Sequence, residues 1–234
     1  LLIIVVLIPD IFIYLKLKKS RFKLTWRILN FIPALFFIGS FVFLKISGRQ
    51  IHDPGVFYFL IWVNFLFSII YIPKILYVIF HFLNFLLNIF LPYRTYVFRW
   101  IGGVIALSAI LFMLHGAFIN IRNFELKKVE IEVKNLPDGF DGYKIIQISD
   151  IHLGGWDQQH GYMTPAIKII NNQKADIIIF SGDMINNFHQ EMNSWQPYFN
   201  QLKAESGKYA VLGNHDYGDY VDWKNQDERK TNLD

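Results

Sequence analysis

Long apolar runs in the first half of the chain constrain its fold more than any other feature of the sequence. Residues 1–120 hold almost all of these runs, and hydrophobic residues make up 53% of the chain, which is high for an ordinary soluble domain. Residues 121–234 instead show the mixed polar and apolar texture of a water-soluble α/β domain. The sequence therefore predicts a helical membrane domain over 1–120 and an α/β domain over 121–234.

Four membrane-spanning helices are expected in the first half. The apolar runs cover residues 1–15, 26–44, 56–91 and 97–119. The third run is too long for one span, because an unbroken helix of that length would reach about 54 Å across a hydrocarbon core of about 30 Å. We therefore expect this helix to break at Pro73-Lys74. If the break is instead a tight hairpin, the chain has five spans.

Basic residues predict the orientation of the spans. A cluster follows the first run and consists of Lys16, Lys18, Lys19, Arg21, Lys23 and Arg27. Such a cluster beside a span is typical of the cytoplasmic side of a membrane. Four spans would then place the α/β domain outside the cytoplasm, and five would reverse this. No aromatic-and-basic motif accompanies the cluster, so nucleic-acid recognition is not indicated.

Three apolar segments in the second half are each followed at once by polar residues. The sets after the segments are Asp150 with His152, then Gly182 with Asp183, then Gly213 with Asn214, His215 and Asp216. Successive sets lie about 30 residues apart, the size of one strand-helix-strand unit. Helices are expected over 163–173 and 191–203, and a further half-buried strand within 124–137. In open α/β sheets, ligands bind where the carboxyl ends of the strands meet.

The side chains expected at this edge are those of a metal centre. Carboxylate, imidazole and amide groups are present without a thiolate, because the chain has no cysteine. This set of donors suits Mn²⁺, Fe or Zn²⁺ and does not choose among them. Two divalent ions about 3.5–4 Å apart could clamp a phosphoryl group and lower the pKa of a shared water molecule.

Position along the sheet predicts a role for each group. Asp183, on the middle strand, is best placed to bridge two ions. His215 follows a ligand on a tight turn, so it could contact a phosphate oxygen or protonate the leaving group. Asp216 could orient that imidazole or cap the next helix, and both roles remain open. Gly182 and Gly213 permit a sharp turn or a close backbone approach.

The segments "DIHLG", "GDMIN" and "GNHD" resemble the first three blocks of the calcineurin-like metallophosphoesterases, in particular the bacterial branch with membrane segments before the catalytic domain. The resemblance covers residues 129–234. It implies that Asp150 and His152 bind one metal ion, that Asp183 bridges two ions, that Asn214 binds the second and that His215 acts on the phosphate. It also implies a four-layer α/β/β/α sandwich, of which this chain would supply the first sheet and part of its helices.

The chain departs from this family pattern in two places. Asn186 stands where the commoner form of "GDMIN" has an aspartate, which affects a peripheral contact. The later histidine blocks, including a Gly-His-x-His pair, have no counterpart after Asp216. The chain also begins with Leu1, inside an apolar run, and ends in a polar stretch with no stop signal, so we expect it to be cut at both ends. Without the later histidines, we expect it to bind metal poorly and turn over little as it stands.

The leading hypothesis is a membrane-anchored, two-metal phosphoesterase that hydrolyses phosphomonoesters or phosphodiesters with a metal-activated water. Its substrate could be lipid-linked, and its expected location is the bacterial inner membrane with the catalytic domain outside the cytoplasm. The alternative is a membrane transporter or scaffold with a non-catalytic phosphoesterase-like domain. His115 in the last span and the helical stripe of His81, Asn84 and Asn88 favour that alternative. The two histidines expected at the surface or rim are His160 and His189.

Overall fold

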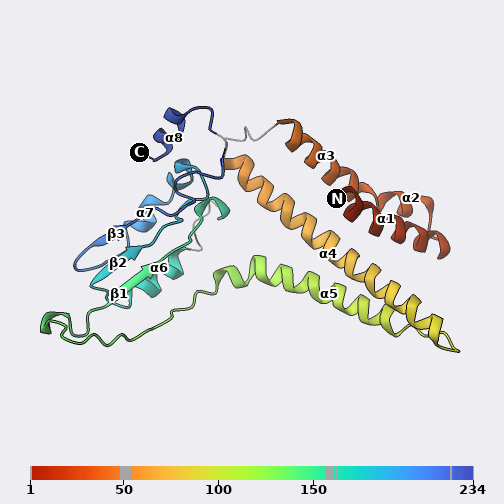
Figure 1. The fold of residues 1–234 in the computed structure, drawn as a ribbon, viewed down its shortest axis with the longest axis horizontal. Helices are drawn as coiled ribbons and strands as arrows, with labels where there is room; N and C mark the ends of the chain where they lie inside the picture. Colours follow the sequence, from red (N-terminus) through yellow and green to blue (C-terminus); the bar gives the residue numbers. More distant parts are fainter. Residues whose placement is uncertain (1, 48–53, 157–160, 162, 222, 234) are drawn as a thin grey trace. The chain divides into compact units, whose positions relative to one another are not determined.

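The computed structural model describes residues 2–47, 54–156, 161, 163–221 and 223–233. The chain forms two compact units (Figure 1). One comprises Leu1–Gly48 and Leu60–Ile121 and is called the helical unit. The other comprises Arg49–Phe59 and Arg122–Asp234 and is called the α/β unit.

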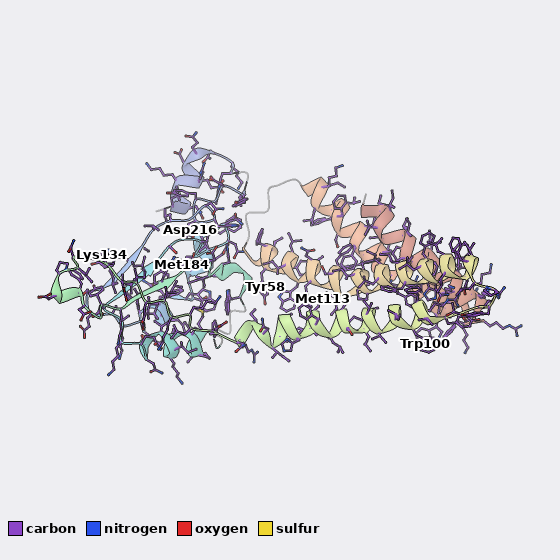
Figure 2. All side chains as sticks on the ribbon, turned by 60° about the horizontal axis from the view of Figure 1, so that its bottom comes forward. Tyr58, Trp100, Met113, Lys134, Met184 and Asp216 are labelled. Carbon is purple, nitrogen blue, oxygen red and sulfur yellow. The ribbon has the colours of Figure 1, made fainter. Side chains whose placement is uncertain are left out.

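Helices dominate the first half of the chain (Figure 1). They are α1 (Leu2–Lys19), α2 (Leu24–Leu29), α3 (Ile32–Ser47), α4 (Pro54–Phe90) and α5 (Val97–Phe118). Three described segments are long and apolar enough to cross a membrane: Leu24–Ile46, Gly55–Phe90 and Val97–Arg122. Their side chains project outward along the helices (Figure 2), and apolar ones such as Leu35 and Phe112 are more than three-quarters exposed. Helices that are apolar on all sides are typical of membrane spans.

The first of the four expected spans is not among these three segments. The run at 1–15 lies within α1, whose 18 residues include four charged ones: Asp10, Lys16, Lys18 and Lys19. Charged side chains raise the cost of placing a helix in lipid. The described part of the chain therefore has three candidate spans where the sequence predicted four.

The expected break at Pro73-Lys74 is wrong, because α4 continues through Pro73. Neighbouring helices can compensate for a proline in a membrane helix. Here Lys74 Nζ donates to Asp10 Oδ1 at 2.5 Å, and the Tyr71 hydroxyl donates to Asp10 Oδ2 at 3.0 Å, so α1 contacts α4 on both sides of the proline. At 1.5 Å per residue α4 is about 55 Å long, so it extends beyond a hydrocarbon core of about 30 Å.

A buried polar cluster holds the helical unit together. Asp10 is fully buried in α1, and its backbone oxygen accepts a hydrogen bond from Asn30 Nδ2 at 2.8 Å. The buried side chains of Val6, Ala34 and Phe37 pack with Tyr71 around this cluster. Because an unpaired buried charge is costly, the contacts between Asp10 and its partners set how α1 lies on α4.

The stripe of His81, Asn84 and Asn88 packs against neighbouring segments. Asn84 Nδ2 and Asn88 Nδ2 donate to the backbone oxygen of Thr95 at 2.9 and 3.0 Å, and Thr95 N donates to Asn88 Oδ1 at 2.8 Å. The His81 ring meets the Phe12 ring of α1 edge to face, with 5.4 Å between centroids. The stripe therefore secures the loop between α4 and α5 and the contact with α1.

The α/β unit contains a parallel sheet in the order β1-β2-β3 (Figure 1). Its strands are β1 (Ile145–Ile148), β2 (Ile177–Phe180) and β3 (Lys208–Ala210). Its helices are α6 (Met163–Asn171), α7 (Gln196–Phe199) and α8 (Gln226–Leu233), with 3-10 turns η2 (Asp138–Phe140), η3 (Leu153–Gly155) and η4 (His189–Met192). A further 3-10 turn, η1 (Asn120–Arg122), lies at the boundary between the two units. The three predicted strands and the helix near 163–173 are confirmed. The helix expected over 191–203 is reduced to η4 and the single turn of α7.

The core of the α/β unit lies on one face of the sheet. Ile178 and Phe180 of β2 are buried there together with Ile167 of α6 and Trp195. On the other face, Ile145 is 60% exposed. Among the described residues, the sheet is therefore covered less on this second face than on the first. These residues form one three-stranded sheet, where a four-layer sandwich has two sheets.

Residues 124–137 do not form the expected strand. The segment has no strand pairing along its described length, and Val129 and Ile131 are each nearly four-fifths exposed. Alternation of polar and apolar residues gives a stable strand only where a neighbour supplies hydrogen bonds and a covering surface. The structure shows no such neighbour for these residues.

Candidate metal centre

The loops after the three strands meet at one edge of the sheet. Asp150 N donates to Gly182 O and His152 N donates to Asp183 O, both at 3.1 Å, which continues the pairing of β1 with β2 beyond the strand ends. His215 N donates to Asp183 Oδ1 at 2.9 Å and ties in the loop after β3. As the sequence predicted, the strand ends deliver their polar residues to one place.

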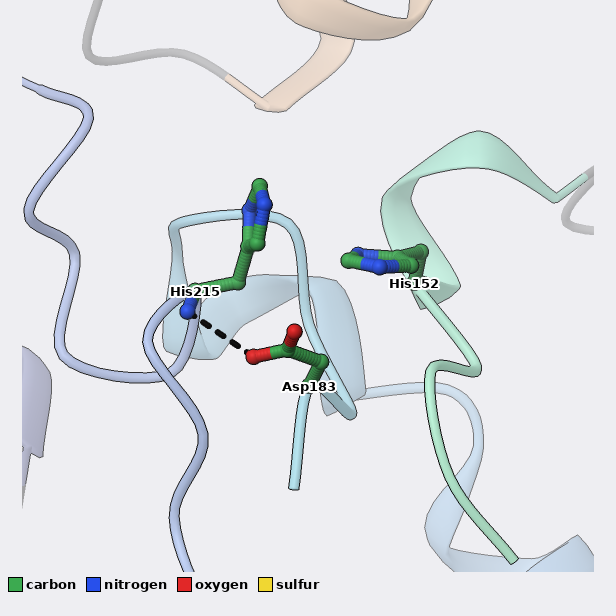
Figure 3. A group of neighbouring side chains, drawn as sticks. All are labelled: His152, Asp183 and His215. Atoms are coloured by element: carbon green, nitrogen blue, oxygen red, sulfur yellow. Dashed lines mark hydrogen bonds between the residues drawn. The ribbon is translucent and has the colours of Figure 1, made fainter. Parts of the chain in front are cut away.

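His152, Asp183 and His215 form a compact group, called here the His-Asp-His group (Figure 3). Each offers one ligand atom, and these atoms lie within 4.8 Å of one another. The two imidazole rings meet edge to face with 4.6 Å between centroids. His152 Nδ1 is buried and has no hydrogen-bond partner. Two imidazoles and a carboxylate are donors that suit divalent transition metals, and the unpartnered nitrogen marks unused binding capacity.

Asp150 lies beside this group, and its side chain is 65% exposed. Its Oδ1 is 3.9 Å from His152 Nε2, and its Oδ2 accepts a hydrogen bond from Ser149 Oγ. Asn214 donates through Nδ2 to the Tyr220 hydroxyl at 2.6 Å. Of the four predicted metal ligands, His152 and Asp183 are members of the group, Asp150 adjoins it, and Asn214 is turned toward Tyr220.

Three residues of the site have left-handed backbone conformations. The φ angles of Asp150, His152 and Asp183 are 54°, 50° and 56°. Residues with side chains rarely adopt such angles, which cost on the order of 1 kcal/mol or more each. Asp and His tolerate them better than most residues do. The chain thus turns sharply at the positions that direct these side chains to the sheet edge.

Gly182 and Gly213 allow two of the loops to touch. Gly182 has a φ of 103°, and a Cβ atom there would lie 2.5 Å from Gly213 N. A Cβ atom on Gly213 would lie 2.6 Å from Asp183 N. Both distances are too short for real atoms, so the close backbone approach predicted from the sequence is confirmed.

Asp216 fastens the loop after β3 to the loop after β2. Its buried carboxylate accepts hydrogen bonds from four backbone N–H groups at 2.8–3.1 Å: those of Asp183, Met184, Ile185 and Gly213. This role differs from the two that the sequence left open, which were to orient His215 or to cap the next helix. The carboxylate is occupied by main-chain donors and so neither orients His215 nor caps the next helix.

His215 is oriented by two other groups. Its Nδ1 lies 2.8 Å from the backbone oxygen of Asn186. A proton on Nδ1 that donates to this oxygen leaves Nε2 free to accept or to carry a second proton. The ring also stacks on Tyr220, with 4.4 Å between centroids and 27° between planes. Asn186 therefore contacts the predicted catalytic histidine through its main chain, although its side chain differs from the commoner aspartate.

Two supporting residues were not predicted from the sequence. Glu191 is buried and accepts hydrogen bonds from the backbone N–H groups of Asn186, Asn187 and Phe188. It thereby holds the loop whose carbonyl contacts His215. Tyr220 contacts both Asn214 and His215, and its only cue in the sequence is its position shortly after "GNHD".

The remaining histidines named from the sequence lie elsewhere or are not described. His189 is exposed, as predicted, and its Nδ1 lies 3.2 Å from Asn232 Oδ1. The side chain of His115 is exposed on α5. His160 lies outside the described residues.

Comparison with known proteins identifies the α/β unit. Residues 143–233 match the family model described as calcineurin-like phosphoesterase. The chain is 36% identical over 108 residues to the uncharacterized metallophosphoesterase YkuE of Bacillus subtilis, an alignment that covers 45% of this chain and 37% of the relative. It is 25% identical over 222 residues to an uncharacterized metallophosphoesterase of Campylobacter jejuni, covering 90% of this chain and 56% of the relative.

A third relative has a named activity. The UDP-2,3-diacylglucosamine pyrophosphatase LpxG of Chlamydia muridarum is 30% identical over 132 residues, which cover 53% of this chain and 40% of the relative. The chain thus spans between about a third and just over half of the length of these relatives. No solved structure matches it significantly. The family match and the three strand-end motifs show that this chain contains a calcineurin-like metallophosphoesterase domain preceded by N-terminal apolar helices.

Proposed function

We propose that the protein is a membrane-anchored phosphoesterase that uses two divalent metal ions to hydrolyse phosphomonoesters or phosphodiesters. The observation that carries this proposal is the His-Asp-His group at the carboxyl edge of a parallel sheet. His152, Asp183, the adjoining Asp150 and Asn214 would hold the ions, whose identity could be Mn, Fe or Zn. Bound divalent ions neutralise phosphoryl charge and lower the pKa of a bound water molecule.

His215 is proposed as the catalytic group of the chain itself. Its Nδ1 is engaged by the Asn186 carbonyl, so Nε2 is the atom left to act on substrate. With both nitrogens protonated, Nε2 can donate to a phosphate oxygen or to the leaving oxygen. The hydrogen bond from His215 N to Asp183 Oδ1 and the stacking of the His215 ring on Tyr220 hold this ring beside the proposed metal ligands.

A lipid-linked phosphoester in a bacterial inner membrane is the proposed setting. The apolar helices would keep the domain close to the bilayer, and the relative LpxG is named for a diacylglucosamine substrate. Basic residues precede the first candidate span, and one more, Arg94, lies between the second and third. By the positive-inside rule, three spans with these flanks favour a catalytic domain outside the cytoplasm.

One of the two features that favour the transporter or scaffold alternative has a structural role. The His81, Asn84 and Asn88 stripe serves helix packing and the α4–α5 loop. His115 is exposed on α5 and joins no polar cluster among the described residues. The stripe therefore needs no transported ligand to explain it.

Hydrolysis by the full-length protein is expected to require a divalent metal. Exhaustive chelation should reduce cleavage of nitrophenyl phosphate esters to background, and Mn²⁺, Fe²⁺ or Zn²⁺ should restore it, because the proposed mechanism depends on metal charge. Elemental analysis should find about two ions per chain. A panel that includes detergent-solubilised lipid phosphoesters then identifies the substrate. Full activity in chelated protein with no bound metal would exclude the proposal.

Replacing Tyr220 is expected to weaken metal binding through Asn214. The Tyr220→Phe change removes the hydroxyl that fixes the Asn214 amide and keeps the ring that stacks on His215. Loss of such an outer contact typically lowers metal affinity about 10-fold or more. Calorimetric titration of metal into the apo protein would measure this, and Tyr220→Leu should also lower kcat.

Tyr217→Phe is the matched control for this experiment, because Tyr217 lies in the same turn and its side chain is outside the contacts of Asn214 and His215. It should leave metal affinity and kcat unchanged. Equal effects of Tyr217→Phe and Tyr220→Phe would show that the Tyr220 hydroxyl has no specific role.

A further inference from the structure

The packing of α1 on α4 brings two separate basic segments to the same end of the helical unit. Asp10 of α1 bonds to Tyr71 and Lys74, and Phe12 meets His81 farther along α4. The two helices therefore advance in the same direction. The last turn of α1 points toward the end of α4 from which residues 91–96 lead into α5 (Figure 1).

Eight basic residues lie on the segments at this end. They are Lys16, Lys18, Lys19, Arg21, Lys23, Arg27, Arg94 and Arg99, and together they are called the basic end. Burial and the charges of Arg99 and Lys19 lower the pKa of Lys16, so the two segments share one electrostatic field. The described residues of the helical unit include one acid, Asp10, and it is occupied by Lys74 at a more central position. The charge of the basic end is therefore not neutralised within the unit.

Aromatic side chains surround the basic end. Trp26, Tyr93 and Trp100 are each at least 60% exposed there, and Figure 2 shows Trp100 near this end of the helices. Tryptophan and tyrosine are enriched at the level of the lipid headgroups. The guanidinium of Arg99 lies 4.9 Å from the centre of the Tyr96 ring, and the Nε atom of Arg99 is buried without a hydrogen bond. The basic end thus has the composition of a membrane–water interface.

We propose that the basic end binds the phosphate groups of anionic phospholipids in the membrane that holds the helices. Charge complementarity supports this occupant, because several unpaired cations converge from two segments at headgroup level. Guanidinium groups bond well to phosphate oxygens. Each juxtamembrane basic residue strengthens binding to an anionic surface by about fivefold. The proposal concerns the helices and is independent of the phosphoesterase activity.

The test compares lipid retention by variants of the full-length protein. The protein is placed in bilayer discs of phosphatidylcholine with or without phosphatidylglycerol, and native mass spectrometry counts the retained lipids. In the variant Arg21→Gln/Lys23→Gln/Arg94→Gln, all three residues are exposed, so the fold should be preserved. We expect retention of phosphatidylglycerol to fall by about tenfold or more, with phosphatidylcholine unchanged. About 0.5 M salt should reduce the difference by screening.

The control variant removes the same charge elsewhere: Lys45→Gln/Lys127→Gln/Lys128→Gln, with Lys45 at the far end of α3 and the other two exposed in the α/β unit. It should retain phosphatidylglycerol like the unchanged protein. Equal losses in both triple variants, or no loss in either, would overturn the proposal. So would displacement of phosphatidylglycerol by millimolar inorganic phosphate, because the site would then bind a soluble anion. Circular dichroism and phosphoester hydrolysis verify that both variants are folded.

Discussion

Replacing Asp183 by asparagine in the full-length protein is expected to lower kcat/KM for phosphoester hydrolysis by more than 100-fold. Outer contacts of a metal site typically contribute about 10–100-fold, and Asp183 is proposed as the ligand shared by both ions. Asparagine has the same shape and keeps an oxygen that can accept the hydrogen bond from His215 N. The change therefore removes the negative charge with little disturbance of the loops.

The matched control is Asp219→Asn, an identical change at an exposed residue whose carboxylate pairs with Arg229. It should stay within a few-fold of the unchanged protein. Both variants are assayed with excess Mn²⁺, and their metal content and thermal unfolding are measured in parallel. The assignment of Asp183 fails if the asparagine variant keeps its two ions and its activity. Loss of activity together with a lowered Tm would point to misfolding. The variant Asp183→Glu separates that case, because it restores the negative charge and should bind metal again.

Replacing Asp216 by alanine is expected to destabilise the α/β unit by at least about 3 kcal/mol. The change leaves four backbone N–H groups without their acceptor, and each buried donor left unpaired costs about 1–3 kcal/mol, partly recovered if water enters. It also separates the two loops that position Asp183 and His215. Urea unfolding followed by tryptophan fluorescence measures the loss of stability.

Hydrogen exchange tests the specific role of this carboxylate. The amides of Asp183, Met184, Ile185 and Gly213 should lose protection in Asp216→Ala, whereas those within β1 should change less. Asp216→Asn should lower the stability by an intermediate amount. Its amide keeps one oxygen that accepts hydrogen bonds, but its N–H₂ group faces backbone donors and cannot accept from them. Asp219→Ala, again exposed, should leave stability within about 0.5 kcal/mol. Unchanged protection of the four amides in Asp216→Ala would refute the role inferred for Asp216.

The features that could be predicted from the sequence are those encoded over short stretches. Each strand of the sheet lies in an apolar segment that is soon followed by a glycine or an aspartate, so the strands and the edge at which they end could be recognised. Once the strand ends meet at one edge, His152, Asp183 and His215 come together without further information. The local sequence pattern and the sheet topology were therefore sufficient to predict which side chains meet at the centre of the site.

The features that could not be predicted depend on partners distant in the sequence. Asp216 bonds to a loop more than 30 positions earlier, and no local pattern distinguishes that role from a helix cap. Local reasoning also expected α4 to break at Pro73, but Asp10, from another helix, bonds to both sides of the proline. Residues 124–137 do alternate between polar and apolar side chains, but a strand forms only where a neighbouring strand pairs with it, and the described structure has none there.

The ion pair between Asp10 and Lys74 has a consequence for biosynthesis. Lys74 lies in the middle of a long apolar helix, and an uncompensated lysine at the centre of a membrane helix costs about 2.5–3.5 kcal/mol on insertion scales. Asp10 is translated 64 residues earlier, so the counter-charge already exists when Lys74 leaves the ribosome. When α1 is still beside the insertion site as α4 arrives, the pair lowers the cost that Lys74 adds to the integration of α4.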